Sequence, residues 1–121
     1  MKENVIKDKS FAFALRIVKM FQFLQSGKKE FVLSKQLLRS GTAIGALVRE
    51  AEQAESKADF IHKMAIAQKE ANETDYWIEL LFQSGYLEES SYKSIISDVI
   101  ELKKLLASIL LTSKGNHYGK K

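Results

Sequence analysis

Carboxylates and histidine at helical spacing could hold a metal centre, and the sequence contains one approach to that arrangement. A di-iron site in a helical bundle takes Glu from two helices and a Glu-x-x-His pair from each of the other two. Asp59 and His62 alone approximate such a pair, and the second histidine, His117, stands close to the end of the sequence. We therefore expect no metal centre and no cofactor.

Nucleophilic catalysis has equally little support. The sequence contains no cysteine, which excludes disulfides, thiolate catalysis and cysteine-ligated zinc or iron–sulfur sites. No serine stands in the Gly-x-Ser-x-Gly context of a hydrolase nucleophile. Gly41 and Gly45 do not form a phosphate-binding loop, because no strand precedes them and the Walker pattern is absent. We expect a protein that is not an enzyme.

Charged residues embedded near apolar positions are candidates for structural ion pairs. They are Arg39, Arg49, Glu70 and Glu73. Pairs of Arg and Glu between antiparallel helices, or between subunits, would account for them. Guanidinium groups also bind phosphate well, so contact with a nucleic-acid backbone is the alternative. We favour structural pairing, because removal of one partner from a buried pair strands a charge.

Basic residues gather towards the two ends of the sequence. Residues 1–30 contain seven lysines and arginines against three acids, and the last eight residues, "KGNHYGKK", are also basic. The formal net charge of +4 permits contact with nucleic acid without requiring it. Our candidates for sequence-independent, salt-sensitive phosphate contacts are Arg16, Lys19, Lys28, Lys29, Lys120 and Lys121.

Apolar periodicity predicts the elements that position these residues. Apolar side chains recur at intervals of three and four over about 10–25, 34–54, 57–84 and 89–111, with no proline to interrupt them. Ser34 and Ser56 suit helix N-caps, and Gly85 suits a helix end. Short connections favour an all-α, antiparallel up-down-up-down four-helix bundle over 1–113. The remaining residues, 114–121, are expected to form a basic flexible tail.

Four further residues are expected to serve helix packing or a subunit interface. Gly41 and Gly45 stand one turn apart inside the second helix, where each costs roughly 0.5–1 kcal/mol relative to Ala. This cost predicts that a neighbouring backbone packs closely against them. Tyr76 and Trp77 could stack on bases, but the acids around them would repel phosphate. We therefore assign both aromatic residues to the core or to a subunit interface.

A family resemblance rests on two segments, "LSKQLLRSGTAIGALVREAEQAESKADFIHKM" and "IAQKEANETDYWIELLFQSGYL", which together make up about half of the chain. In them the chain resembles the four-helix-bundle proteins encoded by intervening sequences in bacterial large-subunit ribosomal RNA genes, a family often labelled as a ribosomal protein. Two positions depart from the family pattern: Ala43 stands where Ser is usual, and Leu47 where Asn is usual. This chain therefore lacks the two polar side chains that the family pattern places on the second helix.

The resemblance also carries expectations about assembly and partners. A related branch of the family serves as the accessory protein of diversity-generating retroelements, where the bundle forms a homopentamer and contacts reverse transcriptase and nucleic acid. By resemblance, we expect a homopentamer without enzymatic activity. Its partners would be RNA, DNA or a protein such as a reverse transcriptase.

The leading functional hypothesis is thus a non-enzymatic, oligomeric bundle that binds RNA or DNA electrostatically, associated with ribosomal RNA or a retroelement. The alternative is a protein-interaction scaffold that binds no nucleic acid, and a carboxylate-bridged metalloenzyme is a third possibility. The N-terminal segment lacks a small-residue cleavage site, and charges interrupt its apolar run before it reaches membrane-spanning length. We expect a cytoplasmic protein without a membrane segment.

Overall fold

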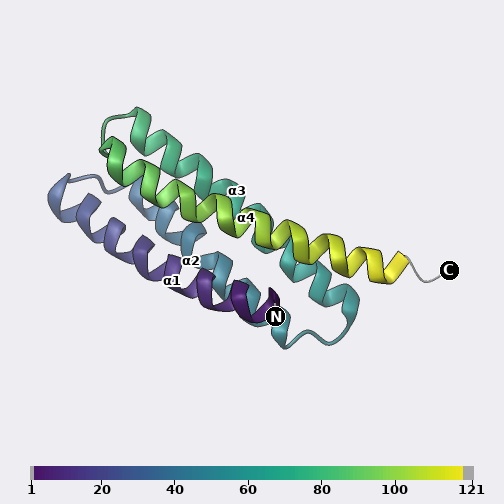
Figure 1. The fold of residues 1–121 in the computed structure, drawn as a ribbon. Helices are drawn as coiled ribbons and strands as arrows, with labels where there is room; N and C mark the ends of the chain where they lie inside the picture. Colours follow the sequence, from purple (N-terminus) through teal and green to yellow (C-terminus); the bar gives the residue numbers. More distant parts are fainter. Residues whose placement is uncertain (1, 119–121) are drawn as a thin grey trace.

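Four long helices pack side by side in the computed structural model, which describes residues 2–118 and the side chains of residues 4–115 (Figure 1). The helices are α1 (Lys2–Gln22), α2 (Leu33–Glu52), α3 (Lys57–Gln83) and α4 (Glu89–Tyr118), and a short π-helix, η1 (Phe23–Gly27), continues α1. Successive helices run antiparallel and pack against each other, and α4 returns to contact α1 (Figure 1). The predicted all-α four-helix bundle is confirmed.

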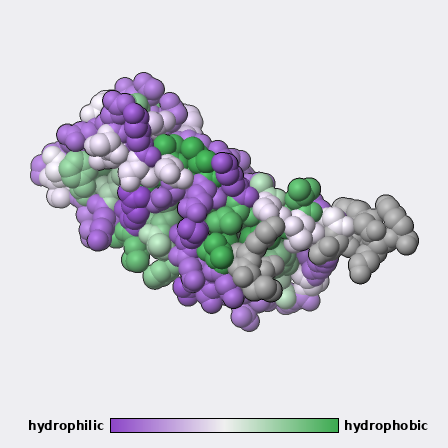
Figure 2. Space-filling model, viewed as in Figure 1, coloured by the Kyte–Doolittle hydropathy of each residue, from purple (hydrophilic) through white to green (hydrophobic). Residues whose placement is uncertain are grey.

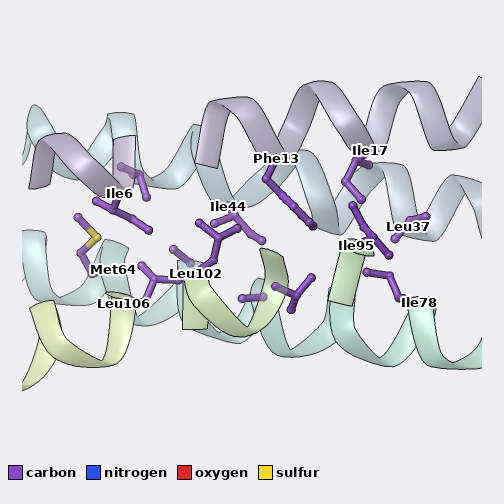
Figure 3. Close-up of a cluster of buried hydrophobic side chains, with 14 of the residues drawn as sticks. Ile6, Phe13, Ile17, Leu37, Ile44, Met64, Ile78, Ile95, Leu102 and Leu106 are labelled. Carbon is purple, nitrogen blue, oxygen red and sulfur yellow. The ribbon is translucent and has the colours of Figure 1, made fainter. Parts of the chain in front are cut away.

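The apolar positions that predicted the helices form one core along the bundle axis. Figure 3 shows side chains from all four helices pointing into the same space: Ile6, Phe13, Ile17, Leu37, Ile44, Met64, Ile78, Ile95, Leu102 and Leu106. Each is almost completely buried. Burial of one such side chain contributes about 1.5–3 kcal/mol, so the core supplies most of the driving force for folding.

The first and last helices are longer than the sequence predicted. The helix α1 begins at Lys2 rather than near residue 10, because Ser10 lies inside the helix and donates a hydrogen bond from its hydroxyl to the carbonyl of Lys7 (3.2 Å). The extra turns bring Ile6 into the core. At the other end, α4 continues to Tyr118 instead of stopping near 111, since no proline interrupts it. Residues 114–118 of the expected tail are therefore helical, and 119–121 lie outside the described residues.

The start of α2 is also built differently from the prediction. Ser34 is buried within the first turn, and the residue before the helix, Val32, makes no side-chain cap. Instead the Glu30 carboxylate accepts hydrogen bonds from the backbone N–H groups of Val32 (3.1 Å), Leu33 (2.9 Å) and Ser34 (2.6 Å). The Ser34 hydroxyl donates to the carbonyl of Glu30 (2.9 Å). Glu30 thus supplies acceptors for three backbone donors at the helix N-terminus.

The other two connections follow their predicted signals. The Ser56 hydroxyl accepts a hydrogen bond from the backbone N–H of Asp59 (3.0 Å) and caps α3. At the opposite end of α3, Gly85 has φ +88°, a left-handed conformation that favours glycine. Both the N-cap at Ser56 and the stop at Gly85 are confirmed.

The two glycines of α2 lie against α1. A Cβ at Gly41 would stand 2.9 Å from Ile17 Cγ1 and Cγ2, and one at Gly45 would stand 3.4 Å from the carbonyl oxygen of Ser10. The absence of a side chain at Gly41 therefore allows the core residue Ile17 to fill the space between the helices. The close approach of the two helices gives the glycines a packing role.

Candidate nucleic-acid interface

One of the basic candidates is paired with an acid of another helix at the surface of the bundle. Arg16 on α1 forms an ion pair with Asp98 on α4, and its second guanidinium nitrogen donates to the Ser94 hydroxyl (2.8 Å). Asp98 partly neutralises the charge and fixes the direction of the guanidinium. Arg16 therefore has less freedom to contact a phosphate than the sequence suggested.

The lysine candidates at the end of α1 remain free of carboxylates within the described residues. Lys19 lies in the last turn of α1, and Lys28 and Lys29 follow η1 in the connection to α2. All three are exposed, as is Lys35 in the first turn of α2, which the sequence analysis did not select. Lys120 and Lys121 lie outside the residues that the structure describes.

The one acid within this basic segment faces inward. Glu30 is 7% exposed, and its carboxylate is held by the start of α2. Burial raises its pKa, but hydrogen bonds from the backbone N–H groups of Leu33, Ser34 and Val32 and from the Ser34 hydroxyl outweigh burial and hold the pKa of Glu30 below its usual value. The carboxylate stays ionised without presenting its charge to an approaching phosphate.

Aromatic side chains are exposed on the same connection. Phe23 and Phe31 keep 49% and 51% of their surface exposed. The Lys28 ammonium lies 5.9 Å from the centre of the Phe23 ring. Beside Phe23 is a hollow of about 280 Å³, with Met20 and Ile95 among its apolar walls and Lys19 at its edge.

The charged residues of the α2–α3 contact form a separate cluster. Arg39 forms ion pairs with Glu73 and with Glu70 (3.6 Å to Glu70 Oε1). The indole nitrogen of Trp77 donates to Glu73 Oε1 (3.3 Å). Beneath them the Thr74 hydroxyl donates to the Ser40 hydroxyl (3.0 Å). These contacts tie the polar edge of α2 to α3.

The remaining sequence candidates have different surroundings. Arg49 has no carboxylate partner in the described part of the chain, and its guanidinium lies 5.1 Å from the centre of the Phe11 ring. Among residues 4–115, Arg49 thus forms no interhelical ion pair, whereas pairing between subunits stays a prediction. Tyr76 is exposed and packs edge-on against the Trp77 ring, with the ring centres 5.0 Å apart. Leu47, one of the departures from the family pattern, packs against the core.

No metal site is formed within residues 4–115. Asp59 accepts a hydrogen bond from the backbone N–H of Glu55 (3.3 Å) beside the α3 cap, and His62 is exposed. Among the described residues, no group of three or more His, Asp or Glu side chains comes together to hold a metal ion. His117 has no described side chain.

Comparison with known proteins identifies the family of this chain. The family model of the 23S rRNA-intervening sequence protein matches residues 2–108. The chain belongs to this family. A crystal structure of a protein with unknown function from the S23 ribosomal protein family of Bacteroides thetaiotaomicron VPI-5482 is 60% identical. The match covers 91% of this chain and 98% of that one, with a TM-score of 0.90. No curated protein matches the chain.

The family assignment confirms the resemblance found in the helix-two and helix-three segments. The family name refers to an intervening sequence in 23S rRNA. The related crystal structure is described as that of a protein with unknown function. Within the described residues, every helix is too short or too polar to cross a membrane.

Proposed function

We propose that this protein is a non-enzymatic, homo-oligomeric bundle that binds RNA or DNA through its phosphate groups. The observation that carries the proposal is a set of exposed lysines around the α1–α2 connection that have no carboxylate partner among the described residues: Lys19, Lys28, Lys29 and Lys35. Elsewhere on the described surface, many basic side chains face a carboxylate, as Lys7 faces Glu52 and Lys103 faces Asp75. Lysines without such partners gain most from meeting a phosphate backbone.

Assembly strengthens such binding. By resemblance to the retroelement accessory branch, we propose a homopentamer in the cytoplasm. A ring would repeat the lysine cluster on each subunit, and repeated weak contacts on one nucleic acid increase the overall affinity. The mass of the assembly in solution, measured by light scattering, tests this part of the proposal.

A titration against a structured ribosomal RNA hairpin and a DNA duplex over a range of salt concentrations tests binding. We expect the logarithm of the affinity to fall linearly with the logarithm of salt concentration, with a slope of about −0.9 per phosphate contact on duplex DNA. The double substitution Lys28→Gln with Lys29→Gln should reduce the magnitude of that slope by about 2. Absence of binding even at low salt would remove the proposal.

A protein-interaction scaffold is the second candidate, and one observation favours it. Phe11, Leu15 and Val18 are exposed along the outward side of α1, one helical turn apart, and Figure 2 shows apolar surface exposed between hydrophilic patches on this view of the bundle. Such a stripe suits contact with another protein, including a neighbouring subunit or a reverse transcriptase. Loss of assembly or of partner capture by Leu15→Glu, with unchanged nucleic-acid binding, would support the scaffold.

A further inference from the structure

The connection between α1 and α2 exposes more aromatic surface than closing the bundle requires. Phe23 and Phe31 each keep about half of their surface in solvent, and Val32 beside them is more exposed still. The residues that close the connection are others: Leu24 is completely buried, and Glu30 holds the start of α2. The two exposed rings are therefore available for a ligand.

The surroundings of the rings determine the charge of that ligand. Lys28 lies over the Phe23 ring, and Lys29 is adjacent in the chain to Glu30, whose carboxylate is turned away from the surface. Lys19 and Lys35 flank the connection from the two helices. The exposed aromatic rings lie beside exposed cations, and the nearest carboxylate, that of Glu30, is buried. These surroundings favour an anionic ligand that carries flat apolar groups.

The backbone of the connection is fixed before any ligand binds. The N–H of Lys28 donates to the carbonyl of Phe23 (3.3 Å), and the N–H of Glu30 donates to the carbonyl of Leu24 (2.9 Å). These bonds, together with the Glu30 cap, hold both ends of the segment to the helices. A segment ordered in advance loses less conformational entropy on binding.

We propose that the turn platform, residues 23–32, binds unpaired nucleotides of RNA or single-stranded DNA, with bases stacked on Phe23 and Phe31 and phosphates against Lys28 and Lys29. This inference rests on the proposed function and adds the class of substrate. Single-strand binders combine cations along the backbone with aromatic rings under the bases. A duplex offers the same phosphates, but its bases are stacked inside and cannot reach the rings. The hollow beside Phe23 provides room for a base that leaves the strand.

The test compares fluorescently labelled single strands of about 12 nucleotides with the matching duplex, using the full chain at one salt concentration. The informative variant is Phe23→Leu with Phe31→Leu, which keeps apolar bulk but removes the aromatic faces. We expect it to weaken single-strand binding at least about tenfold and to leave duplex binding unchanged. The matched control is Phe11→Leu, since Phe11 lies on α1 outside the platform and is 50% exposed.

Each result has a defined meaning. Preference of the wild-type protein for single strands, lost in the double Leu variant and retained in Phe11→Leu, supports the proposal. Equal affinity for strand and duplex, with no effect of the Leu substitutions, overturns it. In that case, a reduced salt slope in the Lys28→Gln, Lys29→Gln variant would leave the proposed function standing. Competition by poly-glutamate as effective as that by RNA of equal charge would indicate a general polyanion site and would also overturn the stacking proposal.

Discussion

The α1–α2 and α3–α4 connections lie at the same end of the bundle, and each joins two antiparallel helices (Figure 1). Their side chains are exposed to very different degrees. The α3–α4 turn is short, closes through Gly85, and buries Leu87. Its neighbouring aromatic rings, Phe82 and Tyr92, stack on each other with centres 4.1 Å apart. The α1–α2 turn, together with η1 that leads into it, leaves two phenylalanines in solvent.

The charges of the two turns are also opposite. Exposed Glu88 and Glu89 begin α4, where negative charge suits a helix N-terminus. The α1–α2 turn instead exposes Lys28 and Lys29 and hides its acid. Joining antiparallel helices at this end therefore requires neither exposed rings nor exposed cations. Those features of the α1–α2 turn are available for binding.

The two turns should differ most in how much one of their carboxylates contributes to the free energy of unfolding. Glu30→Ala removes three hydrogen bonds to the start of α2 and leaves one buried and two partly buried N–H groups without their acceptor. We expect a loss of about 3 kcal/mol in the free energy of unfolding. The exposed Glu88→Ala should cost less than about 1 kcal/mol. Urea denaturation at equal protein concentration measures both, and equal losses would contradict the comparison.

The same carboxylate predicts an acid-sensitive component of stability. The folded state holds the pKa of Glu30 below its ordinary value of 4.5, so ionised Glu30 stabilises the fold fully above pH 4.5. That contribution disappears as the pH falls through the lower pKa of the folded state. Glu30→Gln should therefore be less stable than wild type at neutral pH, and the gap should narrow on acidification. A gap that stays constant between neutral and acidic pH would argue against an ionised cap.

These two predictions concern a residue whose role could not be read from the sequence. Glu30 acts across two to four residues in an irregular turn, a pattern without a recognised capping signature, whereas Ser56 and Gly85 follow known ones. The predicted first helix began near Ser10, and the burial of Ser10 against α2 depends on packing between helices, which the local sequence does not show. Helix periodicity is a local property, and it was therefore sufficient to predict the four elements.

At the candidate site, too, the sequence shows the features of single residues but not the contacts between distant ones. The charge of Lys28 and Lys29 is visible in the sequence, but the partner of Arg16 stands on α4 and could not be identified there. The surroundings of Phe23 likewise depend on how the chain leaves α1, and the sequence analysis makes no prediction for this residue. Where α1 passes into η1, Leu24 takes the buried position and Phe23 remains exposed.

Replacement of a glycine in each turn by alanine should change the free energy of unfolding by a smaller amount. Gly85→Ala places a side chain at φ +88°, which costs about 1–2 kcal/mol in the left-handed region. A Cβ at Gly27 would meet the Phe23 ring at 3.4 Å, which is an ordinary contact. Gly27→Ala should therefore leave the free energy of unfolding unchanged or slightly increased. Thermal and urea denaturation measure the stability of both variants. A larger loss of stability in Gly27→Ala than in Gly85→Ala would contradict this prediction.

The smallest effect on stability is expected where the proposed effect on binding is large. Phe31→Ser removes a half-exposed ring and should change the free energy of unfolding by no more than about 0.5 kcal/mol. Tyr86→Ser, in the α3–α4 turn, removes a ring that packs against the core and should cost about 1–2 kcal/mol. Urea denaturation measures both values. A costly Phe31→Ser would mean that the ring supports the fold, and its exposure would then no longer argue for a ligand.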